Sequence, residues 1–513
     1  MKKNIFGLAI LALISFLTFD SCKKDKLLTD SGATLAFSVD TIQFDTVFTT
    51  IGSATQVFTV RNTYDQPLKI SSITLSPDIY NFFRLNVNGT PGKSFTDVEI
   101  GANDSIFIFA EVTLDPNNQY TPLMIEGDII FNTNGHQQNL PVVSYGQNAH
   151  FFPTSACGEE KSQCTPLFKL KDCGGTSHSL HWINDKPYVI YGYAILDSGY
   201  TLTIDPGVRI HFHNSSGLIV LNTAKLIVNG TLADPVTFQG DRLGEEYKDV
   251  PGQWDRIWFS SITSLDLSEC PIVPVSGGGP IGNVLNYAII KNGFVGIQTD
   301  TAGSSNFTAV ELNNCIIKNC ASTAFYGNGS YAHANNCVFA NCGEYLCFLP
   351  YGGAYRFLHC TFANYWSNSN RSSPSLLFNN YFVSGNGLYI RPIDAYFGNC
   401  IVYGNQDTEI GFDTVTTGSY VTLKLDHCLY KIDNDTYNGS SQYYLNSIKN
   451  ADPNFRDIDN NYYKIDSTSI AVNLGLQSIT DLNPTVLSTD IEGKTRPANT
   501  TAPDAGAYED DNQ

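Results

Sequence analysis

The C-terminal two-thirds of the chain repeats one short pattern of apolar and polar positions. The clearest copies are residues 286–292, 313–319, 335–341 and 358–364, and weaker copies begin near residues 379, 398 and 426. Their third positions are spaced 27, 22, 23, 21, 19 and 28 residues apart, at Ala288, Cys315, Cys337, Cys360, Tyr381, Cys400 and Cys428. A period of about 22 residues predicts one coil of a parallel β-solenoid per copy.

Side chains alternate along a strand, so positions three, five and seven of each copy share one face. Position five is apolar or aromatic in every copy, which predicts that this face points into the core: Ile290, Ile317, Phe339, Phe362, Val383, Val402 and Tyr430. The third-position cysteines are then expected to stack as buried thiols rather than disulfides. Position seven predicts an asparagine ladder at a turn, each amide bonding its equivalent in the next coil: Asn292, Asn319, Asn341 and Asn364.

The segment before the repeats predicts a different domain. Residues 34–145 alternate about seven short apolar strands with turn clusters, which is typical of a β-sandwich. The stretch 58–63, with residues 68–70 and 106–110, resembles immunoglobulin-like domains of the ASPM-SPD-2-Hydin kind. That resemblance implies a spacer or adhesion module.

The first residues have the layout of a secretory signal: Lys2 and Lys3, an apolar run over residues 5–19, then Ser21 and Cys22. This ending resembles a bacterial lipobox, which implies that residues 1–21 are removed and that Cys22 carries the lipid. Residues 22–33 would be a polar tether, and the protein an outer-membrane lipoprotein of the cell envelope, exposed at the surface. The alternative is an ordinary cleaved signal with an incidental cysteine.

Composition narrows the choice of partners. The formal net charge is −19 and only 15% of residues are charged, so nucleic acid is not an expected partner. Of the 13 cysteines, Cys157, Cys164 and Cys173 lie in a polar connector and are the better disulfide candidates. The sequence leaves open which two of them pair.

The flanks of the repeats resemble right-handed parallel β-helix proteins of the pectin-lyase-like kind. Residues 201–208, 226–231 and 251–259 look like the first coils of such proteins. Residues 490–497 and 504–509 resemble the terminal segment of Bacteroidetes proteins called choice-of-anchor Q. The resemblance covers residues 146–510 and predicts an all-β chain, with an Ig-like β-sandwich followed by a right-handed parallel β-helix and a C-terminal cap.

Polar and aromatic side chains suggest a glycan surface on the coils. The second position of each copy predicts an outward stripe: Tyr287, Asn314, Asn336, His359, Asn380, Asn399 and His427. Aromatic and cationic candidates for glycan contact gather around one coil: Tyr351, Tyr365, Trp366 and Arg371, with His427 further along. The plainer interpretation is that these are solvated ladder residues and aromatic side chains that pack turns.

Three functions remain open from sequence. The first is a non-catalytic envelope protein that binds glycan or mediates adhesion. The second is a polysaccharide lyase acting on uronic acids, with His359 as base, Arg356 as charge neutraliser and Tyr355 as acid. The third is a structural envelope component. The clustered aspartates and Gly-His-Gly of polygalacturonase-type hydrolases do not appear on the predicted coils.

Calcium is the one cofactor that the sequence suggests. Asp433, Asp435, Asp457 and Asp459 lie in acidic turns whose oxygens could hold this ion. Their spacing lacks that of a complete EF-hand loop, and exposed acidic turns without an ion are commoner.

Overall fold

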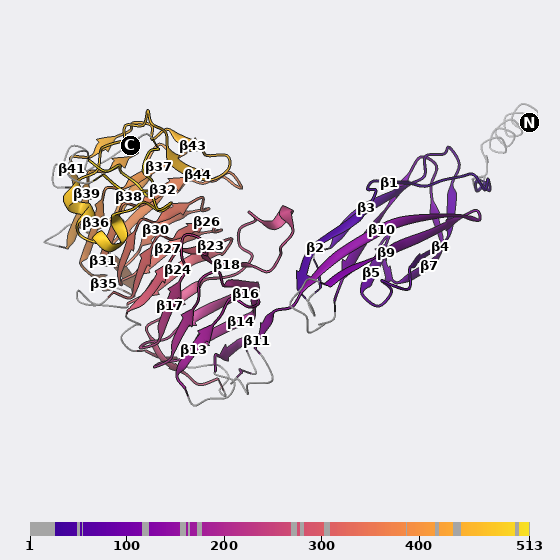
Figure 1. Ribbon diagram of the computed structural model, residues 1–513, viewed down its shortest axis with the longest axis horizontal. Coiled ribbons are helices and arrows are strands. Elements are labelled where there is room, and N and C mark those ends of the chain that lie inside the picture. The colour runs from indigo at the N-terminus through magenta and orange to yellow at the C-terminus, as the bar shows by residue number, and fades with distance from the viewer. Residues whose placement is uncertain are drawn as a thin grey trace, which may run out of the picture. The chain divides into compact units, whose positions relative to one another are not determined.

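A computed structural model describes residues 26–48, 52–53, 55–114, 123–153, 161–162, 165–171, 177–267, 274–276, 282–301, 308–385, 387–415, 420–433, 443–497 and 502–511. Contacts divide the chain into two units, Met1–Asn148 and Ala149–Gln513, both built of strands (Figure 1). The predicted lipidation residue Cys22 and the cysteines Cys157, Cys164 and Cys173 lie outside the described residues. Within those residues, no helix has the length and hydropathy needed to cross a membrane.

The N-terminal unit is a β-sandwich of two five-stranded sheets. One sheet has the order β1 (Ala36–Phe37), β3 (Gln56–Arg61), β8 (Ser105–Val112), β5 (Phe83–Val87) and β6 (Thr90–Gly92). The other has the order β2 (Ile42–Phe48), β10 (His136–Gln147), β9 (Leu123–Thr133), β4 (Leu68–Leu75) and β7 (Ser94–Ile100). Alternate residues are buried along β3, β5, β8 and most of β4, and buried residues of both sheets form one core.

The C-terminal unit is a parallel β-helix whose coils build three ladders, which we name A, B and C (Figure 1). Ladder A contains β11 (His150–Phe152), β14 (Tyr188–Leu196), β16 (Arg209–Val220), β18 (Val236–Gly240), β23 (Ala288–Lys291), β26 (Ile316–Lys318), β29 (Val338–Ala340), β32 (Thr361–Asn364), β37 (Ile401–Gly404), β40 (Leu429–Tyr430) and β42 (Ile448–Lys449). Ladder B contains β12 (Leu167–Lys169), the ends of β14 and β16, β19 (Ile257–Phe259), β24 (Val295–Asp300), β27 (Thr323–Asn328), β30 (Tyr345–Leu349), β33 (Leu376–Asn379) and β38 (Ile410–Asp413).

Ladder C is a separate ten-stranded sheet. It contains β13 (Ser179–Trp182), β15 (Thr201–Ile204), β17 (Lys225–Asn229), β22 (Asn283–Asn286), β25 (Val310–Asn313), β28 (Tyr331–Asn335), β31 (Gly353–Leu358), β36 (Ile393–Gly398), β39 (Val421–Asp426) and β41 (Tyr444–Leu445). A short 3-10 helix, η1 (Glu245–Tyr247), lies between β18 and β19. The predicted fold class, all-β with a sandwich followed by a parallel β-helix, is confirmed.

The third-position cysteines line the interior of the coils, as predicted. Five stacked thiols have no exposed surface and are free: Cys315, Cys337, Cys360, Cys400 and Cys428. Their sulfurs accept bonds from the neighbouring coil, since the backbone N–H of Cys400 lies 3.3 Å from Cys428 Sγ. Burial raises the pKa of the Cys337 thiol well above its usual range.

One copy of the repeat was predicted wrongly. Residues 381–384 form β34 (Tyr381–Ser384), which pairs with β35 (Gly387–Ile390) outside the ladders, and Val383 is 66% exposed. β32 pairs directly with β37, Thr361 beside Ile401, so a single long coil separates them. The apolar residues of this protruding strand pair alternate as they do in a core strand. The sequence pattern therefore predicted a core strand at residues 381–384.

The predicted asparagine ladder exists, but at other positions. Asn313 Nδ2 donates to Asn286 Oδ1 at 3.1 Å, and Asn335 Nδ2 donates to Asn313 Oδ1 at 2.9 Å, so position one carries the ladder. The position-seven amides bond other groups instead: Asn292 donates to the carbonyl of Lys248, and Asn319 donates to Asp249. Residues near η1 therefore replace the next coil as partners of these two amides, and Asn341 Nδ2 donates to Asn461 Oδ1 of the C-terminal segment.

The C-terminal segment covers the outer face of ladder A and the corner between ladders C and A. It contains β43 (Phe455–Asp457), β44 (Tyr462–Ile465), α2 (Gln477–Thr480) and α3 (Pro484–Leu487). Tyr463, Ile491 and Tyr508 pack on Val338 and Ala363 of ladder A.

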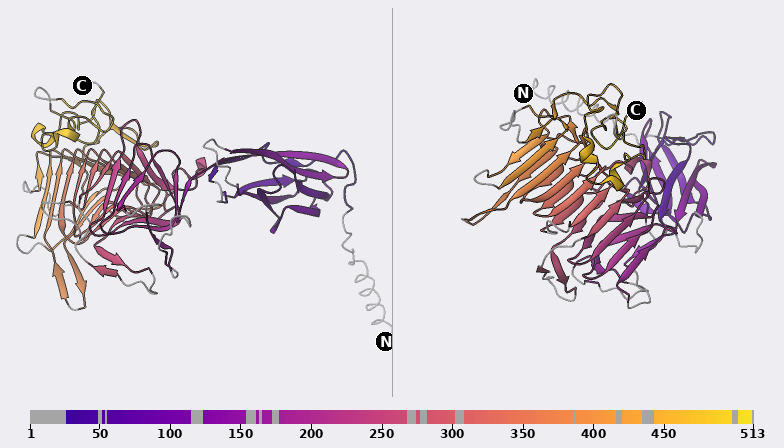
Figure 2. Two further views of the ribbon diagram at one scale, coloured as in Figure 1. Left: turned by 60° about the horizontal axis from the view of Figure 1, so that its bottom comes forward. Right: turned by 60° about the vertical axis from the view of Figure 1, so that its left-hand side comes forward.

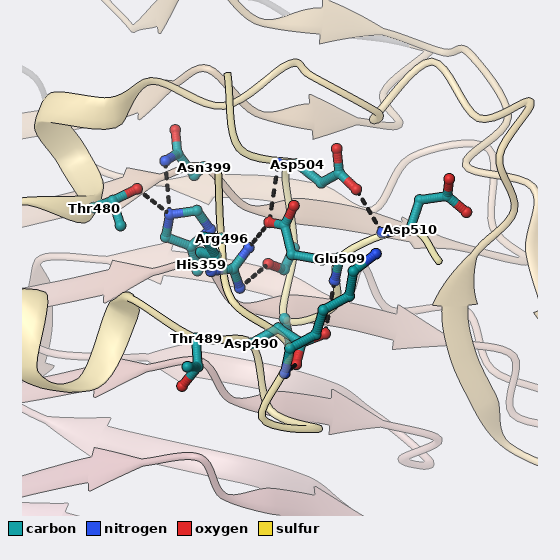
Figure 3. A network of polar contacts seen from close by, with 12 residues as sticks. His359, Asn399, Thr480, Thr489, Asp490, Arg496, Asp504, Glu509 and Asp510 are labelled. Carbon is teal, nitrogen blue, oxygen red and sulfur yellow. Dashed lines mark hydrogen bonds and ion pairs between the residues drawn. The ribbon is translucent and has the colours of Figure 1, made fainter. Parts of the chain in front are cut away.

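A buried polar network fixes the end of this segment (Figure 3). Arg496 pairs with Glu509, and both side chains are almost completely buried. Asp490 Oδ2 accepts the backbone N–H of Glu509 at 2.9 Å. Arg496 also donates to Asn336 Oδ1 at 2.8 Å, which ties the segment to the coils.

Candidate functional site

The outer face of ladder B presents one row of side chains, which we call the ladder B row. Parallel pairing places equivalent residues of successive coils side by side: Ile219, Trp258, Gln298, Tyr326, Phe348 and Leu377. Three of the six are aromatic, and the ring centroids of Tyr326 and Phe348 lie 5.4 Å apart. Adjacent coils are about 4.8 Å apart, so the row is a straight track across several coils.

Two antiparallel strand pairs leave the coils at the same corner, after ladder B and before ladder C. The first is β20 (Ile262–Leu265) with β21 (Pro274–Ser276), and the second is β34 with β35. Both project from one side of the β-helix, in rose and orange in the left view of Figure 2. β20–β21 follows β19 and β34–β35 follows β33, so they flank the row about four coils apart, or about 19 Å.

A pocket of about 440 Å³ opens at the first strand pair, and we call it the Trp258 pocket. Its apolar wall is formed by Trp258, Ile219, Ile262, Leu265 and Leu167. Its polar side is formed by Tyr193, Asp255, Arg256 and Gln298. An apolar pocket with a few convergent polar groups is the usual form of a ligand site.

Hydrogen bonds hold the polar side of this pocket in place. Arg256 binds Asp255 through two parallel bonds, Nε to Oδ2 and Nη2 to Oδ1, each 2.9 Å long. The Tyr193 hydroxyl donates to Asp255 Oδ2 at 2.7 Å. Partial burial, and after it the bond to Asp255, raise the pKa of Tyr193 well above its usual range, so the hydroxyl keeps its proton at neutral pH.

The network continues along the row to Asp300. Arg256 Nη1 donates to Gln298 Oε1, and Gln298 Nε2 donates to both oxygens of Asp300 at 3.1 Å. The indole N–H of Trp258 donates to Asp300 Oδ2 at 2.5 Å. The Trp258 ring is thus fixed by its polar edge while it forms the apolar wall of the pocket.

The second strand pair ends the row with an aromatic cluster. Phe382 and Tyr389 are cross-strand partners whose rings stack at 4.8 Å, and both are about half exposed. Tyr351 packs edge-on against Phe382 at 4.8 Å, and the Arg391 guanidinium lies 5.8 Å from the Tyr351 ring. Tyr351, a residue predicted for glycan contact, therefore does lie in an aromatic cluster.

The three residues proposed for lyase chemistry do not converge. His359 is completely buried at the corner between ladders C and A, with Nε2 2.9 Å from both Thr480 Oγ1 and Asn399 Nδ2 (Figure 3). Tyr355 points into the core, where its hydroxyl donates to the carbonyl of Gly327 at 2.6 Å. Arg356 lies on the outer face of ladder C, 3.2 Å from His333 Nδ1. These positions correct the expectation of a shared groove.

The outward stripe at position two also needs correction. Six of its seven residues occupy the corner with positive φ, for example 53° at Asn336 and 50° at His359, and the C-terminal segment contacts Asn336, His359 and Asn399. The seventh, Asn380, belongs to the misassigned copy and bonds Val415. Asn336 Nδ2 donates to the carbonyl of Thr489 at 2.7 Å, and Asn399 Nδ2 to that of Leu476 at 3.1 Å. Burial, and after it Arg496, lower the pKa of His359 well below its usual range.

The remaining glycan candidates are spread over the molecule. Trp366 and Tyr365 line a polar pocket of about 380 Å³ together with Asp459, one of the calcium candidates. Trp366 is only 6% exposed. Arg371 is buried in an ion pair, and His427 lies in a partly buried pair with Asp426 at 2.7 Å.

The aspartates predicted to bind calcium do not form a ligand cluster in the part of the chain that the structure describes. Asp457 accepts hydrogen bonds from the backbone and side chain of Asn460, which closes a turn. Asp433 is described, and Asp435 lies outside the described residues. Among the residues that the structure describes, no three His, Cys, Asp or Glu side chains form a group that could hold a metal ion.

Sequence reasoning missed the pocket because the repeat alignment covered ladders C and A only. The residues of ladder B fall between the copies, where spacing varies with the inserted strand pairs. One signal was present: residues 251–259 place an aspartate, an arginine and two tryptophans around a single strand. Alternation along β19 would have assigned Trp258 to the outer face.

Comparisons with known proteins found similarity among solved structures only. No family model matches the chain, and no curated protein matches it. A family 123 glycoside hydrolase from Clostridium perfringens aligns at 10% identity over 23% of this chain and 30% of its own, with a TM-score of 0.17. The catalytic unit of a GH87 alpha-1,3-glucanase from Streptomyces thermodiastaticus aligns at 10% identity over 73% of this chain and 74% of its own, with a TM-score of 0.23. At these TM-scores neither alignment carries a functional argument.

Proposed function

We propose that the C-terminal unit binds a glycan chain along the ladder B row, with one sugar held in the Trp258 pocket. The observation that supports this is the fixed Trp258 ring beside the Asp255–Arg256–Gln298 network. Aromatic faces pack against the apolar faces of sugar rings, while the neighbouring polar groups bond their hydroxyls. A straight row of coil-spaced side chains suits an extended polymer.

The pocket is better suited to binding than to catalysis. A lyase or hydrolase needs an acid or base that can exchange a proton with its substrate. Both oxygens of Asp255 already accept bonds from Arg256, and both oxygens of Asp300 accept bonds from Gln298. Carboxylates engaged in this way orient neighbouring groups, so binding without turnover is the function that the contacts favour.

The cellular setting is part of the same proposal. The signal-like start and Cys22 support an envelope lipoprotein of the outer membrane, and the C-terminal motifs support a choice-of-anchor Q protein of Bacteroidetes. In that setting the lipid would hold the protein at a membrane while the β-helix binds a polysaccharide. The anchor is tested separately by labelling cells with a palmitate analogue. We expect the wild-type protein to be labelled and the Cys22→Ser variant to remain unlabelled.

The binding proposal is tested with the purified chain carrying Cys22→Ser, screened against neutral and acidic oligosaccharides by calorimetry. We expect Trp258→Ala to weaken the best ligand at least about tenfold, since truncating a central aromatic anchor typically has such an effect. Tyr420→Ala is the control, because Tyr420 is an exposed aromatic residue directly before the ladder C strand β39. Equal affinity of both variants, or release of shortened products by the wild type, would contradict the proposal.

A further inference from the structure

The N-terminal sandwich carries an aromatic surface of its own. On the outer face of the β1–β3–β8–β5–β6 sheet, Val57, Phe107 and Phe109 are 50%, 54% and 37% exposed. Phe107 and Phe109 are two residues apart on β8, so they share a face, and Val57 lies directly opposite Phe109 on β3. An apolar surface of this kind on a monomeric domain marks an interaction site more often than chance.

Beside Phe109 the sheet is hollowed. A pocket of about 540 Å³ is lined by Phe109 together with Arg84, Asn86, Pro91, Lys93 and Glu111. The pairing Phe109–Asn86–Pro91 runs straight across β8, β5 and β6, and Arg84 lies opposite Glu111 in the next row. The hollow therefore combines one aromatic face with charged and amide groups.

Two polar groups of the hollow, the Arg84 guanidinium and Asn86 Oδ1, have no hydrogen-bond partner among the described residues. Lys93 already donates to the carbonyl of Tyr80 at 2.8 Å, and Glu111 accepts the hydroxyl of Thr55 at 2.7 Å. In the described part of the chain no hydrogen bond or ion pair engages the Arg84 guanidinium, which is exposed. Asn86 Oδ1 is buried, and no donor among the described residues reaches it. The hollow thus offers a cation and an acceptor that needs an O–H or N–H.

We infer that this hollow binds a carboxylated sugar, of the uronic acid class. The pyranose ring would lie on Phe109, its carboxylate would pair with Arg84, and one hydroxyl would donate to Asn86 Oδ1. An acidic peptide fits less well. It would extend the sheet at its edge strand β6, whose central residue Pro91 has no N–H to offer.

The inference goes beyond the ladder B row and needs no ligand there, because the site lies in the other unit. It is tested on the full chain carrying Cys22→Ser, with a galacturonic acid trimer as probe and a neutral glucose trimer as comparison. We expect the acidic trimer to bind better, with Arg84→Gln lowering its affinity about tenfold or more and Arg84→Lys by less, because a charged partner is removed in one variant and kept in the other.

Two controls separate this site from the one in the C-terminal unit. Arg61→Gln removes an exposed arginine from the same sheet, and Trp258→Ala disables the ladder B pocket. Both should leave affinity for the acidic trimer unchanged. Loss of acidic-trimer binding in Trp258→Ala, with Arg84→Gln unaffected, would overturn the inference while supporting the ladder B proposal. Equal binding of both trimers, or no binding at millimolar concentration, would also overturn it.

Discussion

Arg371 and Glu409 form an ion pair in which neither side chain has any exposed surface. Two nitrogens of the guanidinium donate to the two carboxylate oxygens at 2.7 and 2.9 Å. Glu409 Oε2 also accepts the backbone N–H and the hydroxyl of Ser375. Arg371 therefore fastens the long loop between β32 and β33 to the next coil, and it is not available to a glycan.

Removing one partner of this pair should destabilise the C-terminal unit strongly. We expect Arg371→Met to lower the free energy of unfolding by about 3–5 kcal/mol, because Glu409 is left buried and unpaired. The double variant Arg371→Met, Glu409→Met should lose less than the sum of the two single variants. Denaturant unfolding measures both quantities, with Lys424→Met as an exposed control within about 0.5 kcal/mol of wild type. Strict additivity would contradict this account.

Much of the architecture could be predicted from the sequence, because each coil repeats the same local packing requirement. Cys315, Cys337 and Cys360 repeat because every coil needs a small apolar side chain at the same corner of its core. The site could not be predicted in this way. Its defining contacts join residues 62 and 42 positions apart, Tyr193 to Asp255 and Trp258 to Asp300, and no repeat spacing encodes them. The outward position predicted for His359 was wrong for a related reason, since the residue that contacts its ring, Thr480, lies 121 positions later in the chain.

The interior thiols should be chemically silent in the native protein. Among the residues that the structure describes, eight cysteines are buried and free: Cys315, Cys320, Cys337, Cys342, Cys347, Cys360, Cys400 and Cys428. Alkylation requires the thiolate and access to it. We expect iodoacetamide to modify them only after unfolding, as mapped by mass spectrometry. Asp394→Cys places an exposed thiol on ladder C as the positive control. Native modification of the eight at the control's rate would refute the buried assignment.

The C-terminal network should make stability depend on pH through Glu509. Burial raises the pKa of Glu509 to about 7, and the nearby Arg496 only partly offsets this. A raised folded-state pKa means that folding favours the protonated acid. Its contribution, about 3 kcal/mol, is therefore complete below the ordinary pKa near 4.5 and is lost as pH rises through about 7.

This pH effect is measured as the difference between wild type and Glu509→Gln. His359 acts in the opposite direction, since its lowered pKa removes stability as pH falls below the ordinary histidine value of 6.5. Both proteins contain His359, so the subtraction cancels it. The melting-temperature difference between the two should shift between pH 4.5 and 7.5 in favour of the variant. A constant difference across that range would show that Glu509 stays ionised beside Arg496.

Glycan length should determine whether the second strand pair contributes to binding. Phe382 and Tyr389 lie about four coils from the Trp258 pocket, or about 19 Å along the row. A short oligosaccharide in the pocket cannot reach them, whereas a longer chain along the row can. The double variant Phe382→Ser, Tyr389→Ser should therefore weaken long oligosaccharides several-fold, since each lost stacking contact is of the order of 0.5–1.5 kcal/mol, and leave the shortest ligand unaffected. Val383→Ser is the control, because Val383 is even more exposed but points to the opposite face of β34 from Phe382. If the double variant and Val383→Ser behave alike at every chain length, the row ends before β34–β35, and the aromatic cluster has another role.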